Sequence, residues 1–92
     1  MDSAWHVVYY QSEKGECELL EFLESRKGQE LQKIHAWIAL LEEKGPQVPR
    51  PYADLLRDGI HELRIKLTGN QVRVLYFFCF RDYVVLTHAF TK

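Results

Sequence analysis

The chain has 92 residues, 47% of them hydrophobic and 27% charged, which fits one globular domain with one modest core and excludes a disordered chain. Its net charge of −1 argues against nucleic-acid binding through overall charge, and two cysteines are too few for a disulfide framework. The apolar runs are too short to cross a bilayer and the N-terminus lacks signal-peptide features, so we expect a single cytoplasmic domain over residues 1–92 without a membrane segment.

The charge is unevenly distributed along the chain. Residues 1–49 carry five Lys or Arg against nine Asp or Glu, whereas residues 50–92 carry seven against four. Such asymmetry is a weak indication that the C-terminal half faces a polyanion.

The N-terminal half predicts one strand and two helices. Residues 5–10 are rich in β-branched and aromatic side chains and predict a strand. Residues 13–27 and 29–44 repeat apolar side chains at helical spacing, with Gly28 as the expected cap of the first helix. The glutamates of the first helix resemble a metal-binding face, but a solvated surface is the favoured interpretation, and we expect no metal site and no cofactor.

The C-terminal half predicts a helical turn followed by strands. Residues 51–58 begin with proline and end before Gly59, which favours one or two helical turns. Residues 60–67 alternate apolar and polar side chains and predict the first arm of a hairpin around a Gly-Asn turn. Residues 71–80 are apolar on both faces except for Arg73 and predict the second arm as a central strand, and residues 83–90 predict a last strand.

The element order therefore predicts an α+β fold. A first strand and a helical hairpin precede a three-stranded antiparallel meander (β-α-α-β-β-β), with the helices packed on one sheet face. Alternation along 60–67 directs Leu63 and Ile65 toward the helices and places Glu62, Arg64 and Lys66 on the opposite face.

This charged face has two interpretations. In the first, Glu62, Arg64 and Lys66 are the solvent side of a half-exposed strand, and their ion pairs contribute little. In the second, fixed cations hold an RNA phosphate and stabilise charge on it, while a histidine or a tyrosine moves the proton. The second interpretation implies metal-free cleavage in which the RNA 2′-hydroxyl attacks the adjacent phosphorus.

Three ordered motifs resemble the RelE/ParE superfamily of toxins from bacterial type II toxin–antitoxin modules, in particular its HigB-like, phage-associated branch. The first motif runs from Leu56 through Gly59, Ile60, Glu62 and Leu63 to Arg64, the second comprises Arg73, Val74, Leu75 and Tyr76, and the third comprises His88, Phe90 and Lys92. The resemblance implies a compact RelE-like fold and an mRNA interferase that cuts mRNA on the ribosome and is held inactive by a cognate antitoxin.

The resemblance also implies roles for residues. Arg64, Lys66, Arg73 and Lys92 match positions that bind RNA or phosphate, and Arg73 would stabilise the scissile phosphate. We expect His88 to act as general acid or base and Glu62 to partner Arg64 or act as a base. Tyr76 is expected to be structural or to stack, or else to join the catalytic set; which group is the acid and which the base stays open.

One departure from the family pattern concerns the C-terminus. Relatives continue with a second lysine and a basic helix, whereas this sequence stops at Lys92. This departure favours a first alternative to the endoribonuclease, an attenuated or non-catalytic homologue that acts by binding its antitoxin, which is expected to be a helix-turn-helix protein. A second alternative, which the superfamily itself offers, is a gyrase inhibitor of the ParE kind. Arg73 and His88 argue against the last.

Overall fold

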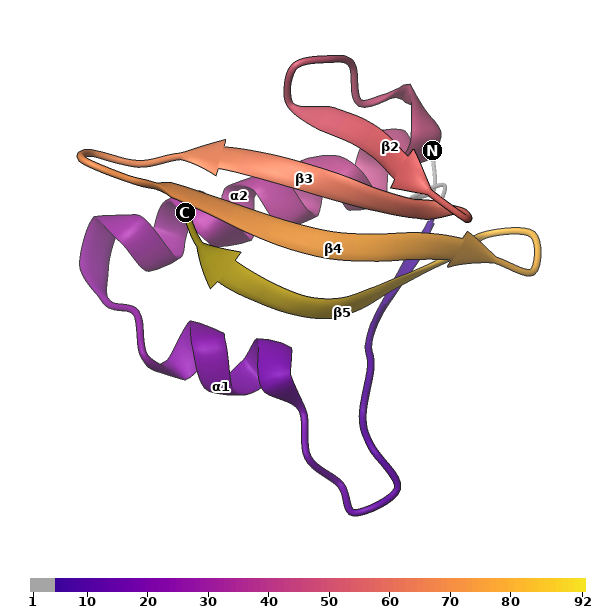
Figure 1. The fold of residues 1–92 in the computed structure, drawn as a ribbon, viewed down its shortest axis with the longest axis horizontal. Helices are drawn as coiled ribbons and strands as arrows, with labels where there is room; N and C mark the ends of the chain where they lie inside the picture. The colour runs from indigo at the N-terminus through magenta and orange to yellow at the C-terminus, as the bar shows by residue number, and fades with distance from the viewer. Residues whose placement is uncertain (1–4) are drawn as a thin grey trace.

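The computed structural model describes residues 5–92. The expectation that the N-terminus has no signal-peptide features concerns in part residues 1–4, which lie outside the described residues. One sheet and two helices make up the fold (Figure 1). The elements are β1 (His6–Tyr9), α1 (Glu18–Glu24), α2 (Gly28–Lys44), the short 3₁₀ turn η1 (Gly45–Gln47), β2 (Ala53–Arg57), β3 (Ile60–Lys66), β4 (Gln71–Cys79) and β5 (Tyr83–Thr91).

The strands form one five-stranded sheet in the order β1-β5-β4-β3-β2. β1 lies parallel to β5, whereas β2 to β5 pair with their sequence neighbours in antiparallel fashion. The predicted α+β class and the order of strand, two helices and antiparallel meander are confirmed. The meander has four strands, because β2 adds one at the edge.

β2 occupies the segment for which helical turns were predicted, and that prediction is wrong. It pairs with β3 from Ala53 opposite Leu63 to Arg57 opposite Ile60. Asp58 and Gly59 both adopt positive φ, 54° and 79°, which forms a tight reversal between the two strands. The local helix-start signal of Pro51 is thus overridden by the backbone hydrogen bonds of a hairpin.

The first helix is shorter than predicted, at Glu18–Glu24. Before it, Ser12 holds a turn, because its hydroxyl accepts hydrogen bonds from the backbone N–H groups of Lys14 and Glu16. Gly28 does not cap this helix but is the first residue of α2. The second helix ends at Lys44 as expected, and Gly45 follows it with φ of 54° directly beside the Trp5 ring, where a Cβ atom has no room.

One hydrophobic core joins the helices to the sheet, and α2 crosses behind β3 and β4 in Figure 1. The helices contribute Leu19, Leu23, Ile34, Ile38 and Leu41, and the strands contribute Leu63, Ile65, Val72, Val74, Val84 and Leu86. Alternate residues of β3 and β4 are thereby directed to the opposite face, where the predicted charges lie. No helix within residues 5–92 combines the length and the apolar character needed to cross a membrane.

Candidate functional site

Glu62 is the centre of the charged face, and it is buried, with only 4% of the residue exposed. Its carboxylate accepts a hydrogen bond from Arg64 Nε at 2.9 Å and lies 3.2 and 3.3 Å from Arg73 Nη1. Arg64 and Arg73 face each other across the β3–β4 pair, so one carboxylate neutralises part of two adjacent positive charges. The ion pairs that the first interpretation expected are present, but Glu62 is buried and does not lie on a solvent-exposed strand surface.

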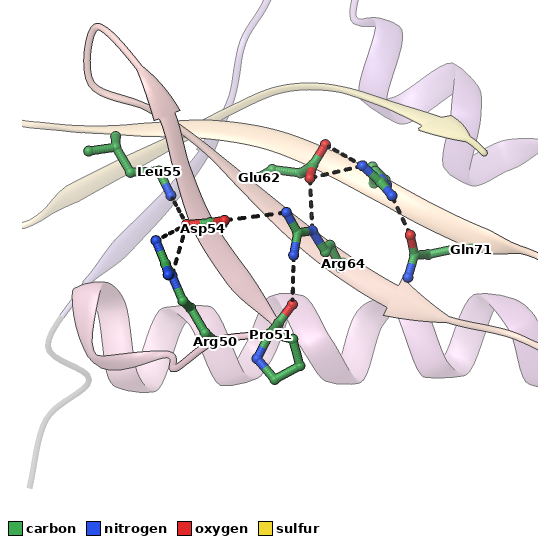
Figure 2. A network of polar contacts seen from close by, with 8 residues as sticks. Arg50, Pro51, Asp54, Leu55, Glu62, Arg64 and Gln71 are labelled. Carbon is green, nitrogen blue, oxygen red and sulfur yellow. Dashed lines mark hydrogen bonds and ion pairs between the residues drawn. The ribbon is translucent and has the colours of Figure 1, made fainter.

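A second layer of contacts orients the two guanidinium groups (Figure 2). Arg64 Nη2 lies 3.4 Å from Asp54, and Arg64 Nη1 donates to the Pro51 carbonyl at 3.4 Å. Arg73 Nε donates to the Gln71 side-chain oxygen at 2.9 Å. The hydrogen bond to Glu62 raises the pKa of Arg64 above its ordinary value, so Arg64 stays cationic. Both arginines are thus held in place before any ligand arrives.

A cationic pocket of about 470 Å³ lies beside this network. It opens beside the N-terminal end of β2, where the pairing with β3 ends at Ala53 opposite Leu63 and is extended by a backbone hydrogen bond from Arg64 N to the Tyr52 carbonyl at 2.7 Å. Its walls come from α2, from the loop before β2 and from the two strands of the hairpin. The lining residues are Lys33, Trp37, Pro51, Tyr52, Arg64, Lys66, Gln71 and Arg73.

The composition of this cationic pocket favours an anion. Four of the lining side chains are cations and none is a carboxylate. Planar guanidinium groups bind phosphate oxygens through paired hydrogen bonds, and pre-oriented groups lose little entropy when they do so. The pocket therefore has the charge, the donors and the size for a phosphate group with part of the molecule that carries it.

Lys66 and Lys92 have different relations to this pocket. Lys66 lines it directly. Lys92 is exposed, but its backbone N–H donates to the carbonyl of Gln71 at 2.7 Å, which extends the β4–β5 pairing and places Lys92 next to a lining residue.

His88 lies outside the cationic pocket. The register places it opposite Leu75, diagonal to Arg73 on the same sheet face. Its Nδ1 atom is 3.1 Å from the Thr87 hydroxyl, and its side chain lines a separate hollow of about 230 Å³ that includes Glu18 and Phe77. The structure thus brings Glu62, Arg64, Lys66 and Arg73 together. His88 lies on the same sheet face but outside their pocket, in a residue pair further along β4 and β5.

Tyr76 lies on the helical face, opposite to Arg73. It is 1% exposed, and its ring stacks on His61 with a centroid distance of 5.2 Å and an angle of 17°. Burial raises the pKa of Tyr76 to about 12. This geometry favours a packing role for Tyr76, the structural alternative stated above.

The high pKa of Tyr76 gives a prediction for alkaline stability. The folded pKa of about 12 exceeds the unfolded value of 10.0, so above pH 10 the unfolded chain loses this proton first. We expect the free energy of unfolding to fall progressively between about pH 10 and 12. Urea unfolding at several pH values measures it, and Tyr76→Phe should flatten this part of the profile; an equally steep decline in that variant would contradict the assignment.

Several residues that line the pocket or contact its arginines were not identified from the sequence. Lys33 and Trp37 lie four residues apart on α2, a spacing that places them on one helix face, and this was the available signal. Tyr52 and Asp54 carried no signal, because they were assigned to a helical turn. Across residues 5–92, no three His, Cys, Asp or Glu side chains gather closely enough to hold a metal ion.

Comparison with known proteins gives one family. No curated protein matches the chain significantly. A family described as phage-derived protein Gp49-like (DUF891) matches residues 21–92, which include every strand of the antiparallel meander and the whole cationic pocket. The chain therefore belongs to the Gp49-like family of phage-derived proteins, which is part of the RelE/HigB toxin-like group.

Proposed function

We propose that this protein is an mRNA interferase toxin of a type II toxin–antitoxin module, of the HigB-like branch. It would be a ribosome-dependent endoribonuclease that needs no metal ion. The observation that carries the proposal is the pocket with four cationic side chains, Lys33, Arg64, Lys66 and Arg73, and no lining carboxylate, in a chain of the RelE/HigB toxin-like group.

In the proposed reaction the RNA supplies its own nucleophile. The 2′-hydroxyl attacks the adjacent phosphorus, the bond from phosphorus to the 5′-oxygen breaks, and the products are a 2′,3′-cyclic phosphate and a 5′-hydroxyl. A base takes the 2′ proton and an acid gives a proton to the leaving oxygen. Arg73 stabilises the charge that builds up on the phosphate oxygens, while Arg64, Lys66 and Lys92 bind neighbouring phosphates.

His88 is the proposed proton carrier. Thr87 engages its Nδ1 atom, which leaves Nε2 for the substrate, and an imidazole nitrogen can accept or donate a proton in general acid–base catalysis. RNA that lies across β4 and β5 reaches both Arg73 and His88, since they are diagonal neighbours on one face. Glu62 is a weaker candidate for the base, because its carboxylate is already bound by Arg64 and Arg73.

A non-catalytic homologue that acts by binding its antitoxin is the second candidate. The observation that favours it is the separation of His88 from the cationic pocket, which leaves neither a histidine nor a carboxylate among the lining residues. In both cases the proposed partner is a cognate helix-turn-helix antitoxin and the proposed location is the cytoplasm; the endoribonuclease would also bind the ribosome and mRNA.

Expression of the chain in bacteria tests the proposal. We expect growth arrest, mRNA cuts within translated regions, and rescue by the protein encoded next to this gene. The same cuts should appear when purified protein is added to translating ribosomes, and they should persist in the presence of a chelator. Intact mRNA at every protein concentration would support the non-catalytic candidate, whereas intact mRNA with DNA damage would indicate gyrase inhibition.

A further inference from the structure

One wall of the cationic pocket is aromatic. Trp37 on α2 and Tyr52 in the loop before β2 both line it, and their ring centroids are 5.1 Å apart with an interplanar angle of 33°. Trp37 is half-buried against the core, whereas Tyr52 is 45% exposed. An aromatic pair thus stands beside four cations, with the outer ring accessible to a ligand.

The backbone of Tyr52 is fixed by the same contacts that shape the pocket. Its N–H donates to the Pro49 carbonyl at 3.0 Å, and its carbonyl accepts the hydrogen bond from Arg64 N at 2.7 Å. The side chain of Arg64 also donates to the carbonyl of Pro51, the residue before Tyr52. The aromatic ring and the guanidinium group are therefore positioned by one short segment, so a ligand that contacts one is held close to the other.

We propose that Tyr52, supported by Trp37, stacks against an unpaired base of single-stranded RNA whose phosphate lies in the cationic pocket. Cationic grooves flanked by aromatic rings bind single strands in this way, because every base has a flat face that can stack on a ring. The contact needs no hydrogen bond to base edges, so it is tolerant of sequence. This inference rests on the proposed function, in which the cationic pocket binds an RNA phosphate. It adds a stacking contact between Tyr52 and the base of the same strand.

Binding of two matched oligonucleotides tests the stacking role. One is a short, end-labelled, 2′-O-methylated RNA, which cannot be cleaved by 2′-hydroxyl attack, and the other has the same backbone without bases. Fluorescence anisotropy at low salt gives the dissociation constants. We expect the wild-type chain to bind the base-containing strand about tenfold more tightly than the abasic strand. Tyr52→Ala should lose this preference while its affinity for the abasic strand stays unchanged.

Three variants serve as controls. Tyr52→Phe keeps the ring and should keep the preference, and Tyr52→Leu keeps apolar bulk without the ring and should lose it. Phe80→Ala removes a 90% exposed aromatic ring that does not line the pocket and should change nothing. Thermal unfolding shows which variants are folded, and Tyr52→Leu replaces Tyr52→Ala if the latter is not.

The outcomes separate this inference from the phosphate proposal. If Arg73→Ala weakens binding of both strands but Tyr52→Ala and Tyr52→Leu retain the wild-type preference, the phosphate proposal stands and the stacking role is wrong. If Arg73→Ala alters neither affinity, the phosphate proposal fails whatever the Tyr52 variants do. Loss of the preference in Tyr52→Ala and Tyr52→Leu, with the preference kept in Tyr52→Phe and Phe80→Ala, supports the base contact as proposed.

Discussion

Arg73→Ala is expected to lower the rate of mRNA cleavage on translating ribosomes by about 100-fold to 1,000-fold and to abolish growth arrest. This change in rate is the size seen when an enzyme loses one preorganised hydrogen-bond donor to the transition state. Among the described residues, Gln71 holds its Nε and Glu62 holds its Nη1. The remaining nitrogen, Nη2, is left for a phosphate oxygen. The loss is therefore expected in the cleavage step, measured as the initial rate at saturating ribosome concentration.

Matched variants separate this role from a general loss of positive charge. Arg81→Ala removes an exposed arginine in the β4–β5 turn, away from the cationic pocket, and should cleave at the wild-type rate. Arg73→Lys keeps the charge but loses the planar fork, so an intermediate rate is expected. Wild-type toxicity in a folded Arg73→Ala variant would rule out the phosphate role.

The two arms of the central hairpin were predictable from sequence, and the edge strand was not. β3 alternates apolar and polar residues and β4 is an apolar run interrupted by Arg73, on either side of a Gly-Asn turn, so both their existence and their pairing follow from local pattern. β2 has no such alternation, and Leu55 and Leu56 remain about half exposed. Its strand conformation depends on hydrogen bonds to β3 and on the positive φ values of Asp58 and Gly59, which the residue pattern alone does not determine.

The same distinction applies to the site. The hairpin register alone places Arg64 opposite Arg73, so their proximity was predictable. The contribution of α2 depends on tertiary packing, and Lys33 was therefore missed. The position of His88 depends on a bulge: the register shifts after Leu75, Thr87 has no opposite residue, and the side chains of this segment are redirected. No local signal in the sequence marks that bulge.

Burial of Glu62 has the largest expected consequence for stability. Glu62→Gln preserves the shape of the side chain but removes the charge that faces Arg73, and the amide presents a donor where two guanidinium groups already donate. Removing one partner of a buried ion pair costs about 3–5 kcal/mol; because the Arg73 side chain is 22% exposed, we expect about 3 kcal/mol. For a chain of 92 residues this lowers the melting temperature by more than about 10 °C, measured by thermal and urea unfolding.

A control variant and a double variant test whether Glu62 and Arg73 stabilise each other. Glu43→Gln changes an exposed glutamate on α2 and should alter the free energy of unfolding by less than about 0.5 kcal/mol. Glu62→Gln combined with Arg73→Gln should cost less than the sum of the two single variants, since the second change removes one of the two cations that Glu62 pairs with. Additive costs would mean that Glu62 and Arg73 do not stabilise each other. In that case the buried carboxylate would not be what holds the arginine toward the pocket, and the preorganisation on which the phosphate proposal depends would need another source.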